Sequence, residues 1–174
     1  PVVAAGGDNE AEVRGMVWGL VPFYERAKTP RRMLPNAKAE TATTLAAFKD
    51  GVAHRRCLVP ANGFYEWRGA ARKRPYWMTS EGSLGYFAAL WEAYPVQGHT
   101  YLSAAVVTLP AATLRRPLML DEAGQAAWLD PETPLETLQA LLAQAEGEGA
   151  RLQVLNPGGA VASEASRQMA PVLV

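Results

Sequence analysis

The chain has 174 residues, one cysteine and no net charge, because 17 Lys and Arg residues balance 17 Asp and Glu residues. This length predicts one domain with a substantial core. A single cysteine excludes an internal disulfide and suits the reducing cytoplasm, where we expect the protein to act. The sequence has no apolar run of about 18 residues and no signal-peptide pattern, so we expect no membrane partner.

Charge is distributed unevenly along the chain. Residues 1–75 hold 13 Lys and Arg against 7 Asp and Glu, whereas residues 76–174 hold 4 against 10. A basic half is compatible with a face that binds phosphate groups. An ordinary solvated surface explains the same asymmetry, so charge alone leaves nucleic-acid binding as a hypothesis.

The first predicted elements are a strand, a loop and a short helix. Residues 14–24 are rich in apolar and aromatic side chains and predict a strand that Pro22 ends. Residues 25–35 are charged and contain two prolines, which is typical of a loop. Residues 43–50 predict a short helix.

Six short apolar or aromatic runs follow. Each has the length of a strand and is bounded by Gly, Pro or charged residues. The runs span residues 57–59, 64–67, 76–79, 86–91, 101–109 and 117–120. A turn at residues 96–98 is expected to join two of them.

Two helices are predicted late in the sequence. The first covers residues 121–129 and the second covers residues 133–145. Thr133 is the expected N-cap of the second helix, Pro134 suits its first turn and Glu136 completes a capping box. The leucines of this helix form one apolar stripe, which predicts core packing: Leu135, Leu138, Leu141 and Leu142.

Many short strands with a few peripheral helices predict an α+β fold. We expect a curled, mostly antiparallel and barrel-like β-sheet. Residues 1–174 are expected to form a single domain that acts as a monomer. The sequence contains no Gly-rich phosphate loop, no Ser-containing nucleophile elbow and no HExxH motif, so it lacks the sites that those motifs predict.

Glu66 is the first candidate for chemistry. It stands between Tyr65 and Trp67, and because side chains alternate along a strand, it shares a face with Phe64. A carboxylate beside aromatic side chains loses solvation, which suits acid–base catalysis. Alternatively, Glu66 lies at the edge of the sheet and reaches water, because Glu is rarely fully buried without a partner.

Asn36 and Lys38 form the second candidate group, after the proline-containing loop. Asn36 offers both a donor and an acceptor, and Lys38 offers a positive charge for a phosphate. Alternatively, this segment is the start of a helix and Asn36 is its N-cap, since Asn ranks among the best capping residues. Both interpretations remain open at this point.

Trp18, Phe23 and Tyr24 flank a proline at the edge of the loop. Aromatic side chains near basic residues suit base stacking, which contributes ~1–3 kcal/mol per base. The alternative is that all three are core residues. Exposure is better supported for Phe23 and Tyr24, which follow the predicted strand, than for Trp18, which lies inside it.

Arg115 and Arg116 precede the last predicted strand, and adjacent side chains point in different directions, so one of them is a candidate phosphate ligand. The alternative is that they are ordinary surface charges. His54 and His99 have no metal-ligand partner at useful spacing and are expected to be solvent-exposed. Cys57 is expected to be an inert, buried thiol. We therefore expect no metal and no cofactor.

Several motifs stand in a particular order along the chain. They are residues 17–22 (VWGLVP), 36–41 (NAKAET), 56–67 (RCLVPANGFYEW), 75–76 (PY), 88–92 (AALWE) and 116–118 (RPL). This order, over roughly residues 15–130, resembles the SOS-response-associated peptidase family of abasic-site processing proteins.

The resemblance implies recognition of an abasic deoxyribose in single-stranded DNA. A cysteine directly after the initiator Met, freed by self-removal of that Met, would trap the sugar aldehyde as a thiazolidine. Asn36 matches the family Asn that positions the N-terminal group, and Glu66 matches the proton-transfer residue. Phe23 and Tyr24 stand where family aromatics wedge against bases. Lys38 replaces a family Arg and keeps its charge without the bidentate fork.

Two positions depart from the family pattern. The sequence begins at Pro1 with no Cys at position 2, so we expect the domain to lack its usual N-terminal segment here. Thr113 and Leu114 stand where the family has His and Asp ahead of the retained Arg115. Thr113 cannot shuttle a proton near neutral pH as the family His does.

Three hypotheses follow for the function. The first is an abasic-site-trapping enzyme with autoproteolytic peptidase-like activity, in which Glu66 and Asn36 are catalytic. In that hypothesis, DNA contacts come from Lys38, Phe23, Tyr24, Trp18, Arg115 and Arg116. The second is a degenerate relative that binds single-stranded or damaged DNA without covalent chemistry. The third is a small-molecule-binding or protein-binding domain on the same scaffold.

Overall fold

The computed structural model of the chain describes residues 1–6, 10–25, 32–68, 74–80, 84–111, 115–144 and 152–155. Within these residues the chain forms a nine-stranded sheet, a three-stranded sheet and four helices. The strands are β1 (Val2–Ala5), β2 (Ala11–Arg14), β3 (Val17–Trp18), β4 (Asn36–Lys38), β5 (Arg56–Ala61), β6 (Phe64–Arg68), β7 (Arg74–Ser80), β8 (Gly85–Val96), β9 (His99–Pro110), β10 (Arg115–Pro117), β11 (Met119–Leu120) and β12 (Leu152–Leu155). The helices are α1 (Ala39–Ala42), α2 (Lys49–His54), α3 (Glu122–Leu129) and α4 (Leu135–Leu142).

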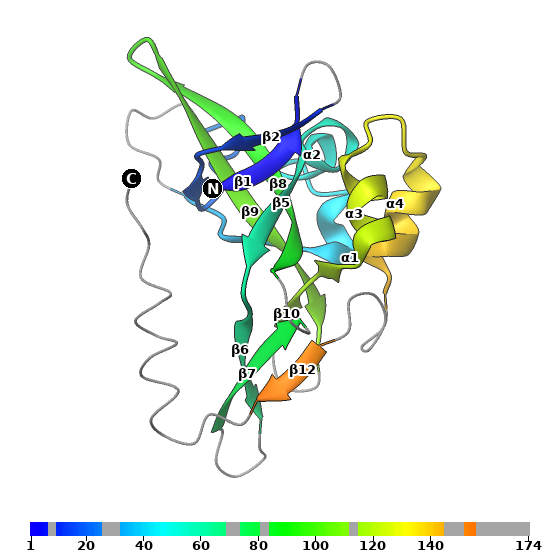
Figure 1. Cartoon of the computed structure of the whole chain (residues 1–174). Coiled ribbons are helices and arrows are strands. Elements are labelled where there is room, and N and C mark those ends of the chain that lie inside the picture. Colours follow the sequence, from blue (N-terminus) through cyan, green and yellow to red (C-terminus); the bar gives the residue numbers. More distant parts are fainter. Residues whose placement is uncertain are drawn as a thin grey trace.

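The nine-stranded sheet is built around a long hairpin of β8 and β9 (Figure 1). The predicted turn between them is confirmed, because Gln97 and Gly98 take the positive φ angles of 50° and 82° that a tight hairpin turn needs. The sheet follows the order β10-β9-β8-β5-β1-β2, and all of these pairs are antiparallel. β3 and β4 are the exceptions, because both run parallel to β9.

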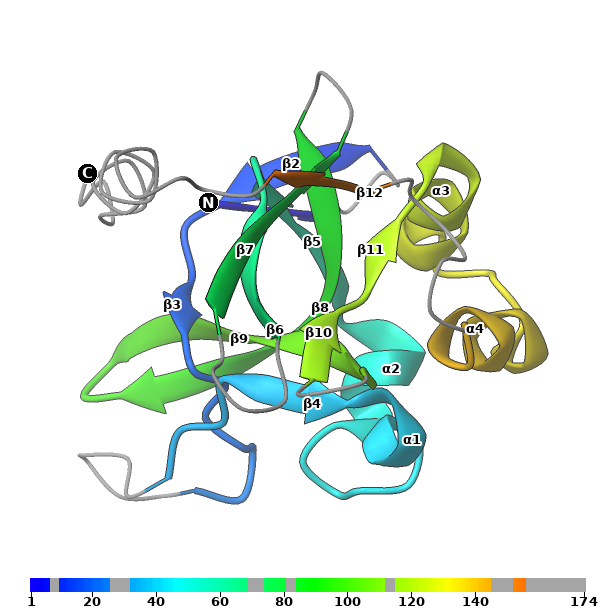
Figure 2. The same cartoon turned by 90° about the horizontal axis from the view of Figure 1, so that it is seen from below.

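The four helices lie together at one side of the main sheet (Figures 1 and 2). The largest cluster of buried apolar side chains packs there, and Trp128 of α3 is its largest member and fully buried. Its other large members are Leu20, Phe48, Val52, Leu58, Leu90, Val107, Leu109, Leu118, Leu120, Leu138 and Leu142. Strand residues on one face of a sheet are therefore buried under helices, as expected for an α+β fold.

The three-stranded sheet has the order β12-β7-β6 and packs against the main sheet through a cluster of buried apolar side chains. Phe64 of β6 packs edge to face against Phe87 of β8, with ring centroids 5.9 Å apart. Gly63, directly before β6, has no room for a side chain, because a Cβ atom would lie 2.3 Å from the Met78 carbonyl oxygen. This close approach explains why a glycine opens the FYEW strand.

Residues 14–24 do not form the single strand that we predicted. β2 ends at Arg14 and pairs with β1, whereas β3 contains two residues and pairs with β9. Gly19 adopts a φ of +115°, which interrupts the extended run, and Leu20 then forms an isolated bridge with Leu34. A break at a glycine with positive φ therefore overrides the apolar strand pattern.

The two late helices are confirmed, with shorter bounds and different capping. Asp121 caps α3, because its carboxylate accepts a hydrogen bond from the Gly124 N–H at 2.8 Å. Thr133 is not the cap of α4, since Pro134 takes that position without a side-chain hydrogen bond. Leu135 is 53% exposed, so the predicted stripe is buried only towards its later leucines.

The short helix that we predicted at residues 43–50 is shifted along the chain. Residues 43–48 form turns, and α2 begins at Lys49. The predicted strands from residue 57 onward are confirmed, with the last of them divided between β10 and β11. Leu118 separates those two short strands, one of which pairs with β9 and the other with β8.

The mostly antiparallel sheet with few helices confirms the α+β prediction, but the barrel-like curl is not confirmed. Within the described strands, β10 and β2 end the path of the main sheet, and no pairing joins them. The sheet is therefore open. No helix in the described ranges is both long enough and apolar enough to cross a membrane.

Candidate functional site

β4 carries the two polar residues of the NAKAET segment. Its parallel pairing with β9 places Asn36 opposite Val106, and Lys38 opposite Thr108. Ala37 is fully buried between them, so the exposed side chains of Asn36 and Lys38 point to the same outer face. The alternative that Asn36 is a helix N-cap is wrong, because α1 begins only at Ala39 and Lys38 occupies the cap position.

Trp18 lies beside β4 on the surface. β3 runs parallel to β9 with Trp18 opposite Ala104, and the indole is 69% exposed. The indole Nε1 donates a hydrogen bond to the Pro35 carbonyl oxygen at 2.8 Å. The alternative that Trp18 is a core residue is therefore wrong, and its exposed ring is tied to the residue directly before Asn36.

Phe23 and Tyr24 lie on the loop that follows β3. They are 44% and 49% exposed, as expected, and their rings pack edge to face with centroids 5.3 Å apart. The loop is anchored to β9, because the Val21 N–H donates to the buried Ser103 hydroxyl at 3.0 Å. Exposed aromatic rings on an anchored loop suit stacking against nucleic-acid bases.

Glu66 lies on the inner face of β6 and is 7% exposed. The predicted alternation is confirmed, because Phe64 is buried on the same face whereas Trp67 is 44% exposed on the other. The alternative that Glu66 reaches water at the sheet edge is wrong. Phe64 belongs to the buried cluster that includes Val106, which is the residue opposite Asn36, so the inner face of β6 is directed towards the part of β9 that holds β4.

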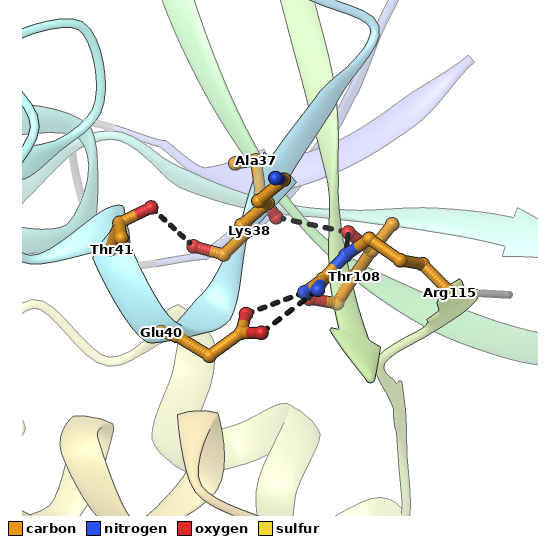
Figure 3. A network of polar contacts seen from close by, with 6 residues as sticks. All are labelled: Ala37, Lys38, Glu40, Thr41, Thr108 and Arg115. Atoms are coloured by element: carbon orange, nitrogen blue, oxygen red, sulfur yellow. Dashed lines mark hydrogen bonds and ion pairs between the residues drawn. The ribbon is translucent and has the colours of Figure 1, made fainter. Parts of the chain in front are cut away.

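Arg115 is half-buried in β10 and contacts β9 and α1 (Figure 3). Its Nε donates to the Thr108 hydroxyl at 2.9 Å, and its Nη1 donates to Glu40 Oε1 at 2.8 Å. This ion pair holds the pKa of the Glu40 carboxyl below its usual value. Arg116 is buried, at 6% exposure, and Thr113 lies outside the described residues.

The remaining sequence-based predictions concern histidine and cysteine. His54 and His99 are exposed, as predicted. Cys57 is fully buried, as predicted, and burial raises the pKa of its thiol to about 12, which disfavours the reactive thiolate. No group of three or more His, Cys, Asp or Glu residues in the described ranges is arranged to hold a metal ion.

The sequence-based search missed Glu40 and Thr108. Glu40 stands two residues after Lys38 in the NAKAET segment, so it was inside a motif that had already been singled out. Thr108 had no local signal, because only the pairing of β4 with β9 brings it beside Lys38. The structure thus places Asn36, Lys38 and Trp18 on two short strands that pair with successive parts of β9, and supports them with residues distant in sequence.

The sequence is similar to those of known proteins. The sequence is 29% identical over 136 residues to the abasic site processing protein YobE of Bacillus subtilis, covering 72% of this chain and 62% of that protein. It is 30% identical over 136 residues to the B. subtilis abasic site processing protein YoaM, covering 72% of this chain and 60% of that one. The matches therefore span about three fifths of these relatives.

The fold also matches a solved structure. A crystal structure of a protein from Bacteroides thetaiotaomicron superposes with a TM-score of 0.74 at 24% identity, covering 90% of this chain and 73% of that chain. The sequence profile of the SOS response associated peptidase family matches residues 1–158, which is most of the chain. The chain belongs to the SOS response associated peptidase (SRAP) family.

Proposed function

We propose that this protein processes abasic sites in single-stranded DNA and traps them covalently. The observation that carries the proposal is the exposed surface of β3 and β4, where Trp18 is hydrogen-bonded to the residue before Asn36 and Lys38 faces outwards beside it. An exposed aromatic ring next to a cationic side chain is the combination that binds single strands. The names of the B. subtilis relatives support abasic DNA as the substrate.

The proposed chemistry begins with an amine and an aldehyde. The N-terminal amine of a cysteine that precedes Pro1 in the full gene product condenses with the C1 aldehyde of the ring-opened abasic sugar, and water leaves. The cysteine thiolate then adds to the resulting iminium carbon and closes a thiazolidine ring. No electrons are gained or lost overall, so the reaction needs proton transfer but no cofactor.

Two residues of the described chain are proposed to serve this reaction. Glu66 donates the proton that lets the carbinolamine oxygen leave as water, and its burial at 7% exposure keeps it away from bulk solvent. Asn36 orients the N-terminal amine through its side-chain amide. Lys38 supplies a phosphate contact, and Phe23 and Tyr24 stack against bases beside the lesion.

A crosslinking assay tests the proposal. The full-length gene product is incubated with a single-stranded oligonucleotide that carries one abasic site, and intact mass and denaturing gels report a stable adduct. Glu66→Gln is expected to slow adduct formation by roughly 10²-fold while single-strand affinity stays near that of the unmodified protein. Glu12→Gln, which changes an exposed carboxylate on β2, is the matched control. An unchanged rate in Glu66→Gln makes Glu66 structural.

A second candidate is non-covalent binding of single-stranded or damaged DNA, which is favoured by Thr113 at the position of the family His. The same assay separates the two candidates. Salt-dependent binding with a slope near −0.7 per phosphate contact, but with no adduct, supports the non-covalent binder. Partial recovery of trapping in Thr113→His would show that the missing imidazole limits the covalent reaction. If the protein neither binds single strands nor forms an adduct, both candidate functions are excluded.

A further inference from the structure

The hairpin of β6 and β7 has an inner face, which the strand register identifies. Phe64 lies opposite Met78 and Glu66 lies opposite Tyr76, and residues opposed in an antiparallel pair share one side of the sheet. Arg74 precedes Tyr76 by two residues on β7, so its side chain belongs to the same face. From the main sheet to the end of the hairpin, the inner face thus carries first Phe64 and Met78, then Glu66 and Tyr76, and then Arg74.

Exposure to solvent increases along this face towards the end of the hairpin. Phe64 and Met78 are buried in the cluster that packs against the main sheet. Glu66 is still buried, whereas Tyr76 opposite it is half-buried and Arg74 is exposed. Figure 1 shows that this end of β6 and β7 points away from the four helices. A substrate that approaches Glu66 along the inner face therefore passes Arg74 and Tyr76.

The Arg74 guanidinium has no acceptor among the residues that the structure describes. Arg14, Arg55 and Arg115 each form an ion pair with a carboxylate, but no ion pair or hydrogen bond of this kind joins Arg74 to a described residue. A guanidinium carries five N–H donors and always keeps its charge. The exposed guanidinium of Arg74 is therefore available to an anion from outside the protein.

A second arginine occupies the position opposite Arg74. The register pairs Arg68, the last residue of β6, with Arg74, the first residue of β7. Like charges at directly opposed positions destabilise an antiparallel pair. A bound anion would offset this repulsion, and the anions of a DNA strand are its phosphate groups.

We propose that Arg74 binds a backbone phosphate next to the abasic sugar, at the exposed end of the inner face that carries Glu66. The inference rests on the proposed function and deepens it, because it names a further contact to the same substrate. Two residues of a strand advance by about 7 Å, so Arg74 is close enough to Glu66 to hold a phosphate of the nucleotide on which Glu66 acts. A sugar whose flanking phosphate is fixed presents its aldehyde to the amine in one orientation, which favours trapping.

Binding measurements on the full-length protein test this contact. The probe is a fluorescent single-stranded oligonucleotide with one tetrahydrofuran abasic analogue, which has no aldehyde and is not trapped. Arg74→Gln is expected to weaken binding about three- to fivefold, as for loss of an exposed ion pair, and to reduce the salt slope by about 0.7. Arg74→Lys keeps the charge and should retain the slope.

The matched control is Arg14→Gln, which removes the same charge from β2, where the arginine is already paired with Glu12. Its affinity and salt slope should equal those of the unmodified protein. Arg74→Gln with the affinity and slope of this control overturns the inference. Equal losses in both variants also overturn it, because they would reflect net charge and not a contact.

Neutral linkages locate the phosphate that Arg74 binds. A methylphosphonate replaces the phosphate at either the 5′ side or the 3′ side of the analogue. At one of these two positions, the neutral linkage should weaken binding by the unmodified protein about three- to fivefold and leave binding by Arg74→Gln unchanged. If Arg74→Gln responds to both linkages as Arg14→Gln does, Arg74 binds neither phosphate and the inference is refuted.

The outcome for Arg74 is separate from the outcome for trapping. Binding of the analogue that depends on Arg74, with no adduct on an oligonucleotide that carries the aldehyde, refutes the covalent function alone. An adduct together with equal affinities of Arg74→Gln and Arg14→Gln refutes the role of Arg74 alone. Full-length protein that does not bind single strands overturns both.

Discussion

Two arginines each join three segments of this protein, one beneath the helices and one beside β4, and they do so by different means. Arg56 is 6% exposed and donates four hydrogen bonds of 2.6–2.7 Å, all to backbone carbonyl oxygens. Arg115 is half-buried and shares its donors between Thr108 and the carboxylate of Glu40. The acceptors of Arg56 do not titrate, whereas those of Arg115 include the titratable carboxylate of Glu40.

The carbonyl groups that Arg56 binds belong to the last turns of α2 and α3. They are Val52 and Ala53 in α2, and Trp128 and Asp130 at the end of α3. The last carbonyl groups of a helix have no partner within the helix and carry partial negative charge, so a cation suits them. Burial lowers the pKa of the Arg56 guanidinium, and nearby Asp130 opposes that shift.

This difference distinguishes two regions: a rigid support around Arg56, which is buried, and an adjustable surface around Arg115, which is partly exposed and contains a titratable carboxylate. The region around Arg56 fixes two helices against the main sheet, and it contains none of the residues to which we assign chemistry. The region around Arg115 lies at the proposed site, where it is open to solvent and responds to charge. Variants in the region around Arg56 should therefore lower the free energy of unfolding more than variants of Arg115 or Glu40.

The largest effect is expected from Arg56→Met. Removing the guanidinium leaves four carbonyl oxygens in the last turns of α2 and α3 without their donor, and breaking such a buried charged network costs ~3–5 kcal/mol. Urea denaturation monitored by circular dichroism measures the loss. A loss below about 1 kcal/mol would mean that water replaces the side chain, and the proposed contrast between the two arginines would fail.

Trp128→Phe should have the next largest effect in the region around Arg56. The indole is fully buried, and its Nε1 donates to the Cys57 and Ala89 carbonyl oxygens at 3.1 and 3.3 Å. Loss of this donor leaves buried acceptors unsatisfied, at a cost of ~1–3 kcal/mol. Trp18→Phe is the matched control, because its indole hydrogen bond is on the surface. Equal losses in both variants would contradict the division into support and surface.

Some features of this structure could be predicted from the sequence, and others could not. The strand that carries Glu66 and the two faces of that strand followed from period-two alternation, which is a local signal. The helix predicted at residues 121–129 rested on a local pattern too, although its cap, Asp121, was not predicted. The roles of Arg56 and Arg115 could not be predicted, because their acceptors come from helices and strands up to 75 residues away. Such contacts depend on tertiary packing, which periodicity does not encode.

The surface position of Trp18 was hard to predict for a related reason. It lies in an apolar run, and such runs normally indicate a buried strand. The turn at Gly19 breaks that run and leaves the indole 69% exposed. If Trp18 binds DNA as we propose, its exposure has a reason that the local pattern does not contain, because a binding residue must stay accessible even where the pattern favours burial.

Arg115→Met should cost the fold less than either change beneath the helices. The side chain is 30% exposed and its Glu40 partner is 47% exposed, so water can solvate Glu40 once the contact is lost, and only the buried Thr108 loses donors that water replaces poorly. Ion pairs of this kind contribute about 0.2–1 kcal/mol. Urea denaturation beside Arg56→Met checks the ranking. A loss as large as that of Arg56→Met would mean that Arg115 is as important to the stability of the fold as Arg56, and the contrast between the two arginines would fail.

The smallest effect is expected from Glu40→Gln, and it should depend on pH. Arg115 holds the pKa of Glu40 below its usual value, chiefly through the hydrogen bond between the side chains. A carboxyl group whose pKa is depressed by folding stabilises the protein above its unfolded pKa, and loses that contribution as pH falls through its folded pKa. The stability difference between unmodified protein and Glu40→Gln should therefore be about 0.2–1 kcal/mol at neutral pH and should vanish in acid.

The effect of Glu40→Gln on stability, measured again in protein that carries Arg115→Met, identifies the cause of the pH dependence. Without the guanidinium, the largest influence on the Glu40 carboxyl is gone, so Glu40→Gln should change stability little at any pH. Added salt should weaken the difference in the unmodified background, because both side chains are partly exposed and screened. A pH dependence that persists in the Arg115→Met background would mean that another group, such as the neighbouring Lys38, sets the charge of Glu40. In that case the pH dependence would arise within β4 and α1 themselves, and not from the ion pair that links α1 to β10.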